Sequence, residues 1–412
     1  MKRSFVVALV FTLALALSAT AAFAGGFRVP EAGSKAMGLS NAFVGMADDP
    51  SAVQFNPAGI TQLDGTQIYF GTTYIGTSNE YTDTGGTTTP AEEMTFFPPH
   101  FYYTNHLGDG DLWFGLGVAV PFGLGTEWDV ASFELIVTDT LIEMVKINPA
   151  IGYRASENLS LAFGIDYYKI MEAKLENEAL LPGPTPAYQE FEGDGDGYGF
   201  NFGLLYTASD MLSVGFAYRS GVSPDLEGDL TVTIDATGLP APGFPTPGSA
   251  DINLPATAAL GISYKLSPRF TLNADLDWTA WSDYDELKLS VPALGPATVL
   301  PKDYSDEIAY RVGLEYDLNE AWNLRGGFLI ESMPIPEETY DPRLPDGDRV
   351  GISIGAGYTK DAWTLDLAYM FVDFSDEDID NDITDAYGQL QTVDGKYDGD
   401  INLFGVSLGY RF

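Results

Sequence analysis

"YGFNFGLLY", residues 198–206, places a large apolar side chain at every second position. Tyr198 and Phe200 begin one face of the stretch, and Gly199 and Asn201 lie on the other. A side-chain period of two is that of a β-strand whose two faces meet different surroundings. The stretch therefore predicts a strand with one apolar face and one face of small or polar residues.

The same alternation recurs along most of the chain. It is clear in "IAYRVGLEY" (308–316), in "WTLDLAYMF" (363–371) and in the final "INLFGVSLGYRF" (401–412). About fourteen such segments begin near residues 67, 98, 111, 143, 158, 196, 211, 251, 269, 306, 322, 349, 362 and 399. Short connectors such as "RASEN" and "TKDA" alternate with long ones, so all short turns fall on one side of the sheet.

This layout predicts an all-β fold, a membrane-spanning antiparallel β-barrel of about 14 strands. Lipid cannot hydrogen-bond to the backbone, so a sheet in lipid must close on itself. The alternative is a soluble β-sandwich, which has the same period. Aromatic residues clustered at strand ends and the regular alternation of short and long connectors favour the barrel.

The beginning of the chain predicts export. Lys2 and Arg3 precede an apolar run, and Ala22-Phe23-Ala24 is a small-x-small cleavage site, so residues 1–24 are interpreted as a signal peptide. Cleavage changes the formal charge from -39 to -41. So acidic a chain is not expected to bind nucleic acid. It has no cysteine, so its stability must come from packing and hydrogen bonds.

Residues 25–63 precede the first strand and lack its period. A barrel of this size encloses a lumen wider than its own side chains fill. We therefore expect residues 25–63 to form a small N-terminal hatch, or plug, inside a barrel formed by residues 64–412. Within the hatch, Pro57 restricts Asn56 to an extended conformation. The alternative is that Asn56 and Pro57 form an ordinary turn.

Several motifs of the chain occur together in one known family. They are Gly26-Phe27, Glu31, the small-residue run from Gly38 to Gly45, Asp49-Pro50-Ser51, Asn56-Pro57-Ala58-Gly59, "NPAIGY" (148–153), "LPATAALGISYKL" (254–266) and the final "GYRF". With these motifs the chain resembles the FadL-type outer-membrane transporters of long-chain fatty acids and other hydrophobic compounds. The resemblance spans nearly the whole mature chain and implies a hatch, capture of the substrate at the outer loops, binding in the lumen and lateral release at a kinked third strand.

The third strand in that scheme is "DLWFGLGVAVPFGLG", residues 111–125. Gly115 and Gly117 lack side chains to pack, and Pro121 cannot donate a ladder hydrogen bond. These three residues are candidates for a lateral opening, and bulky residues at either glycine are expected to lower uptake. The alternative is that the glycines make room for the hatch and that Pro121 ends the strand.

Two further sites are expected for the ligand. Residues 128–144 are predicted to form an amphipathic helix that exposes Phe133, Ile136, Val137 and Leu141 in a groove; alternatively they extend a strand or pack on other loops. Arg311 and Lys146 face inward by parity and are candidate partners for a carboxylate head group. Alternatively, Glu315 neutralises Arg311, and the scarcity of basic residues leaves an uncharged substrate open.

No cofactor or metal is predicted. The acidic run at 372–385 lacks the EF-hand pattern, although acidic loops of this kind can bind Ca²⁺ or Mg²⁺ and bridge to lipopolysaccharide. His100 and His106 are the only histidines, which argues against an enzyme. The expected partners are a hydrophobic substrate, outer-membrane lipid and lipopolysaccharide, and the barrel-assembly machinery, with the protein a monomer. A general diffusion porin or a structural outer-membrane protein is the alternative.

Overall fold

The computed structural model describes residues 25–179, 187–234, 237–384 and 390–412. The signal peptide predicted for residues 1–24 lies outside the described residues. Within them, no helix has the length and apolar character needed to cross a membrane.

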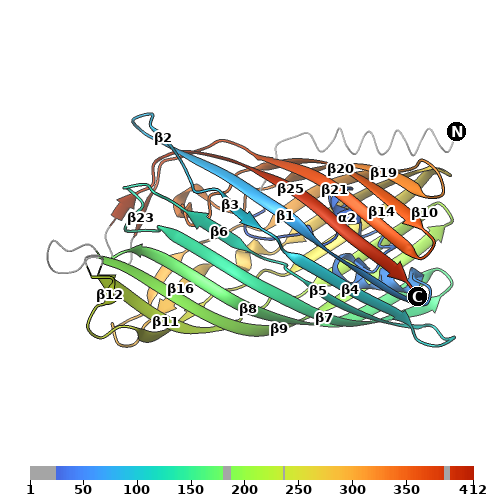
Figure 1. Ribbon diagram of the computed structural model, residues 1–412, viewed down its shortest axis with the longest axis horizontal. Helices are drawn as coiled ribbons and strands as arrows, with labels where there is room; N and C mark the ends of the chain where they lie inside the picture. Colours follow the sequence, from blue (N-terminus) through green and yellow to red (C-terminus); the bar gives the residue numbers. More distant parts are fainter. Residues whose placement is uncertain (1–24, 180–186, 235–236, 385–389) are drawn as a thin grey trace.

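The wall of the molecule is a closed ring of 14 antiparallel strands, as the alternation predicted (Figure 1). The ring closes where the first strand pairs with the last, from Gln67 with Arg411 to Asp83 with Gly395. The wall strands are β1 (Thr66–Asp83), β4 (Pro99–His106), β5 (Leu112–Ala119), β7 (Asp139–Ser156), β8 (Leu159–Glu178), β9 (Ala187–Ser209), β10 (Leu212–Arg219), β14 (Thr257–Ser267), β15 (Phe270–Thr279), β18 (Glu307–Asp317), β19 (Trp322–Glu331), β20 (Arg349–Lys360), β21 (Trp363–Phe374) and β25 (Gly395–Arg411).

Shorter strands extend the wall at the end that carries the long loops. Strand β6 continues the third wall strand, because it pairs with β7 as β5 does. The shorter strands are β2 (Thr88–Pro90), β3 (Met94–Phe96), β6 (Leu124–Glu127), β11 (Asp225–Ile234), β12 (Leu239–Pro240), β13 (Thr246–Asp251), β16 (Glu286–Ser290), β17 (Thr298–Pro301), β22 (Glu377–Ile379) and, in a separate two-stranded sheet, β23 (Asp382–Thr384) and β24 (Leu390–Thr392). Figure 1 shows the C-terminus at the opposite end, with the short turns.

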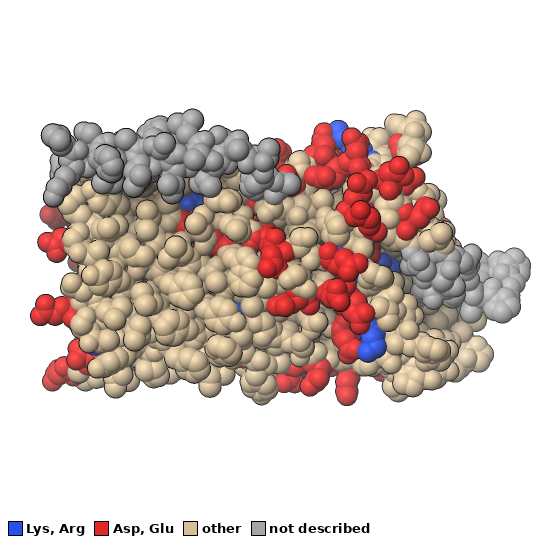
Figure 2. All heavy atoms as spheres, turned by 180° about the vertical axis from the view of Figure 1, so that it is seen from behind, with Lys and Arg blue, Asp and Glu red and all other residues tan. Residues whose placement is uncertain are grey.

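The outer face of the wall is apolar. In β9, Tyr198 is 70% exposed and Phe200 46% exposed, whereas Gly199 between them is half-buried and Asn201 is buried. Phe404 in β25 follows the same rule, with 54% of its surface exposed. Asp and Glu side chains gather in a band toward the loop end (Figure 2). An apolar wall bounded by charged residues suits a barrel that stands in lipid.

Residues 25–63, here called the N-terminal segment, lie inside the ring. Their short helices are α2 (Ser34–Met37), α3 (Ala52–Phe55) and η1 (Pro57–Gln62). Helix α2 contacts β20, β21 and β25, whereas η1 contacts β5, β7, β8 and β9. Contacts with such widely separated parts of a closed ring place the segment across the lumen, and α2 is seen behind the near wall in Figure 1.

Candidate functional site

The buried amide of Asn56 fastens the N-terminal segment to the wall. Its Nδ2 donates to the carbonyl of Leu204 in β9 (3.0 Å) and to that of Val44 (2.9 Å), and its Oδ1 accepts from the backbone of Ala58 (3.2 Å). Its backbone is extended, as the following proline predicted. A Cβ on Gly203 would lie 2.5 Å from its Oδ1, so glycine in β9 lets the amide approach. The motif is therefore more than a turn.

Hydroxyl and carboxylate groups anchor the rest of the segment. The Ser34 and Ser407 hydroxyls are 2.7 Å apart, and Asp275 accepts from the backbone of Phe43 and Val44 at 2.7 and 2.8 Å. Within the segment, Asp49 accepts from Ser51, and burial, opposed by nearby Lys35, raises the pKa of Asp49 to about 6.

Gly115 and Gly117 do not interrupt the third strand. They pair with Thr104 and Tyr102 in β4, and the ladder to β7 is also intact at both positions. A Cβ on Gly115 would lie 2.7 Å from Val53 of the N-terminal segment, and one on Gly117 would lie 3.0 Å from it. Their position agrees with the alternative that these glycines make room inside the lumen.

The third strand breaks at Pro121 instead. Residues 120–123 separate β5 from β6, and here the chain pairs inward with the N-terminal segment. The backbone of Val29 donates to the carbonyl of Pro121 (2.9 Å), and that of Gly123 donates to the carbonyl of Phe27 (3.0 Å). At this point the backbone of the third strand therefore bonds to the N-terminal segment in the lumen.

The inward bend leaves a gap between the second and third wall strands. Their ladder ends where Phe101 pairs with Val118, and the next backbone bond between them runs from Glu92 to Glu127 (3.0 Å). The residues between these two points, 93–100 and 119–126, have no ladder bond to one another among those described. The wall of the barrel is therefore locally unpaired along this stretch.

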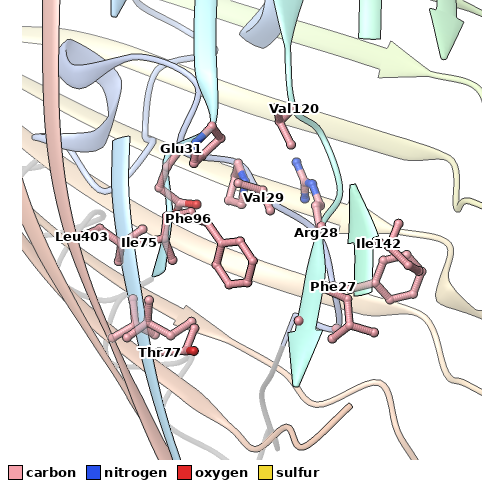
Figure 3. Close-up of a pocket in the computed structure, with 18 of the residues that line it drawn as sticks. Phe27, Arg28, Val29, Glu31, Ile75, Thr77, Phe96, Val120, Ile142 and Leu403 are labelled. Atoms are coloured by element: carbon pink, nitrogen blue, oxygen red, sulfur yellow. The ribbon is translucent and has the colours of Figure 1, made fainter. Parts of the chain in front are cut away.

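A largely apolar cavity of about 500 Å³ lies behind this gap. Both edges of the gap line it, through Phe97 and Pro98 on one side and Gly123 and Leu124 on the other. The N-terminal segment and distant strands complete the lining, as the labelled side chains in Figure 3 show. Phe97, which lines the cavity at the edge of the gap, is 62% exposed. Its volume falls within the roughly 300–1,000 Å³ typical of small-molecule sites.

The Phe96 ring packs against Gly125 across the gap. A Cβ on Gly125 across the gap would lie 2.4 Å from the Phe96 ring, so glycine is needed there for the ring to fit. Figure 3 shows this ring among the cavity-lining side chains. Sequence periodicity gave no reason to single out Phe96, because it lies in a three-residue strand, β3.

The predicted groove helix is wrong. Residues 131–136 form turns, and strand β7 begins at Asp139. Phe133, Ile136 and Val137 are at most 2% exposed, in an aromatic cluster with Tyr81. They pack on other loops, which is the alternative noted for them. Leu141 lies in β7, where it lines a separate, small apolar pocket of about 60 Å³.

A loop between β19 and β20, residues 332–348, closes the cavity toward the long-loop end. Arg343 is paired with Asp341 (2.6 Å) and donates to the carbonyl of Ile136 (2.6 Å). Burial disfavours ionisation of Asp341, but Arg343 and Lys302 outweigh it and lower its pKa. Leu344 of the same loop reaches the cavity lining. The loop is thereby held against the segment that was predicted to be a helix.

The predicted head-group cations both face inward, but each already has protein partners. Lys146 donates to Gln54 of the N-terminal segment (2.5 Å). Arg311 pairs with Asp277 (2.9 Å) and Glu331 (3.2 Å). Glu315, proposed as the alternative partner of Arg311, pairs with Arg325 instead. Neither predicted cation lines the cavity.

The cations that do line the cavity are Arg28 and Arg349. Arg28 belongs to the N-terminal segment, which has no strand period, so parity along strands did not find it. Arg349 is the first residue of β20, where the strand meets the inserted loop. The inward direction of Arg28 is set by the Thr279 hydroxyl, to which it donates (3.1 Å).

Both histidines have structural roles. The His100 Nε2 atom contacts the Ser407 hydroxyl (2.8 Å) next to the N-terminal segment. The His106 ring stacks on Trp113 with centroids 4.1 Å apart near a short turn.

The chain matches the family described as "Outer membrane protein transport protein (OMPP1/FadL/TodX)" over residues 15–412. A long-chain fatty acid transport protein of Escherichia coli O6:H1 is 27% identical, and one of Salmonella typhi is 26% identical, each over 97% of this chain and 97% of the relative.

Solved structures share the fold at lower identity. A Pseudomonas aeruginosa FadL homologue superposes with a TM-score of 0.83 at 23% identity, covering 94% of this chain and 99% of the homologue. The Pseudomonas putida toluene transporter TodX gives a TM-score of 0.69 at 19% identity, covering 91% of this chain and 98% of TodX.

Proposed function

The chain belongs to the FadL/TodX family of outer-membrane transport proteins, and from this premise we propose that it takes up hydrophobic small molecules through the gap between its second and third wall strands. A cavity that opens at this gap carries the proposal. A hydrophobic solute gains free energy when it leaves water for such a cavity, by about 25 cal/mol for each Å² of apolar surface buried. It then passes sideways into lipid without crossing a water-filled pore.

We propose that residues 25–63 act as a hatch in this process. The segment is fastened by Asn56 and Asp275 and fills the lumen between the cavity and the short-turn end. Because the hatch occupies the direct route to the periplasm, the solute leaves the cavity through the gap. Pro121 and Phe96, rather than Gly115 and Gly117, are then the residues that shape the opening.

The outer route into the cavity is proposed to pass the long-loop end. There the inserted loop 332–348 packs on the cluster that contains Phe133, Ile136 and Val137, and Leu141 lies nearby. These residues would meet a hydrophobic solute only after the loop shifts. We also propose that lipopolysaccharide lies beside the acidic band and that the barrel-assembly machinery recognises the aromatic C-terminus.

The proposed function is tested by purifying the protein in detergent, extracting it and identifying bound molecules by mass spectrometry. We expect hydrophobic compounds to be recovered in about equimolar amount. Liposome swelling with sugars separates this function from that of a diffusion porin. Rapid swelling and an extract without hydrophobic compounds would favour the porin.

A further inference from the structure

The buried charged groups in the cavity lining are already paired within the protein. Arg28 and Arg349 are its cations, Glu31 and Glu331 are its buried carboxylates, and Glu143 adds an exposed carboxylate at the rim. Resting on the function proposed above, we propose that this cavity selects uncharged hydrophobic molecules, such as hydrocarbons, over molecules that end in a carboxylate. The curated relatives reported above are named for fatty acids, so the preference would distinguish this chain from them.

The donors of Arg349 are committed to the protein. Its Nε and Nη2 atoms donate to the Asp346 carboxylate at 3.2 and 2.9 Å, and Nη2 also donates to the Gly26 carbonyl at 2.6 Å. A Cβ built on Gly25 would lie 2.7 Å from Nη1 of Arg349 and 2.9 Å from the Glu331 carboxyl. The third nitrogen, Nη1, therefore faces Gly25 and the Glu331 carboxylate. Few donors of this guanidinium remain for a ligand.

Arg28 belongs to a continuous row of ion pairs. Its Nη2 lies 3.9 Å from Asp277, and Asp277 binds Arg311 at 2.9 Å. Arg311 in turn binds Glu331 at 3.2 Å. Glu31, on the other side of the cavity, receives the amide of Asn41 (3.1 Å). Each guanidinium in this row has a carboxylate partner.

A ligand carboxylate would meet a high cost here. Removing it from water costs several kcal/mol, which only a cation or a set of donors can return. To gain the Arg349 cation it would have to displace Asp346, which would then lie buried without its cationic partner, and to gain Arg28 it would have to compete with Asp277. Glu31 and Glu331 would also repel it.

Signal-peptide cleavage does not reverse this balance. Cleavage before Gly25, as the sequence predicts, places one α-ammonium group close to Glu331. The added cation thus arrives with a carboxylate already beside it. An uncharged chain needs none of these groups and loses nothing when it enters.

The test compares two ligands with the same number of carbon atoms. Binding of radiolabelled n-hexadecane and of hexadecanoate to the purified protein is measured at pH 8. We expect hexadecanoate to bind at least tenfold more weakly. Lowering the pH to 4, near the ordinary pKa of a carboxyl group of about 4.3, should raise hexadecanoate binding and leave hexadecane binding unchanged. Equal or tighter binding of hexadecanoate at pH 8 would overturn the proposal.

A variant pair locates the selectivity. Glu31→Gln combined with Glu331→Gln should narrow the tenfold difference to about threefold or less, whereas Glu93→Gln, on an exposed side chain, should leave it unchanged. If the double variant does not fold, the pH series on the unaltered protein still decides. Thr77→Trp, which fills the cavity, separates the two proposals. If the unaltered protein prefers hexadecanoate and Thr77→Trp abolishes binding of both ligands, only the charge selectivity is refuted. If Thr77→Trp leaves hexadecane binding unchanged, the cavity is refuted as the transport site.

Discussion

The half of the lumen near the short turns and the half that holds the cavity satisfy their buried groups in opposite ways. Near the turns, polar bonds run from the N-terminal segment to the wall, as at Asn56 and Ser34. Around the cavity, the charged groups bind one another at the margin, and apolar residues such as Leu403 and Ile142 face the space. The difference teaches that one barrel uses buried polar contacts where the chain must stay and apolar surface where a solute must pass.

The largest effect is expected from Asn56→Leu. Leucine has a similar size but cannot bond to the carbonyls of Val44 and Leu204 or to the N–H of Ala58, and a buried group that loses its partner costs about 1–3 kcal/mol. The N-terminal segment should loosen, and sugar-driven liposome swelling should rise. Asn158→Leu, in a short turn, is the control. Swelling that stays slow would show that polar anchoring does not hold the segment.

A smaller effect is expected from Gly115→Leu. The new side chain overlaps Val53, and overpacking of this kind costs about 1–3 kcal/mol. The barrel should still assemble, because the clash is with the N-terminal segment, and hydrophobic uptake should fall. Gly326→Leu is the matched control, since Gly326 has only one neighbouring atom, at 3.7 Å, in the place of a Cβ. Equal uptake in the two variants would show that Gly115 has no role in uptake.

Thr77→Trp tests the cavity half directly. Thr77 lines the cavity from β1, so tryptophan there should lower uptake at least tenfold, or about 1.4 kcal/mol. Ser78→Trp places the same side chain one residue further along, at an exposed position on the other face. Both variants are assayed for initial uptake of radiolabelled n-hexadecane. A loss in both, or in neither, would contradict the role of the cavity.

The smallest effect is expected at the gap. Phe96→Ala removes the ring that fills the space opposite Gly125, so initial uptake should rise about threefold, which corresponds to about 0.7 kcal/mol. Phe404→Ala truncates an exposed ring of β25 that does not line the cavity, and should leave the rate unchanged. A slower rate in the Phe96 variant would mean that this ring guides the solute and does not obstruct it.

The sequence predicted the wall well because each strand meets lipid on one face and the lumen on the other. Neighbouring residues such as Tyr198 and Gly199 show that contrast, so it can be predicted without knowing which distant residues they contact. The extended backbone of Asn56 was also predicted, because Pro57 restricts its neighbour through local sterics.

The site was harder to predict because its partners are distant in the chain. Phe133 looks like part of a helix from its local pattern, but its burial depends on Tyr81, which lies on β1. Parity correctly turned Arg311 inward, yet it gave no information on Asp277, which neutralises it. Arg28 lies in a segment without any period, so only the folded structure identifies it as part of the cavity.

The central claim is that solutes leave the cavity through the gap between the second and third wall strands. The chain has no cysteine, so Phe96→Cys and Gly125→Cys can be joined across the gap by a short reducible linker. Phe101→Cys with Val118→Cys, at positions already paired in the ladder, is the control. We predict that linking the gap abolishes hydrophobic uptake and that reduction restores it, with no effect in the control; undiminished uptake through a linked gap would contradict the account.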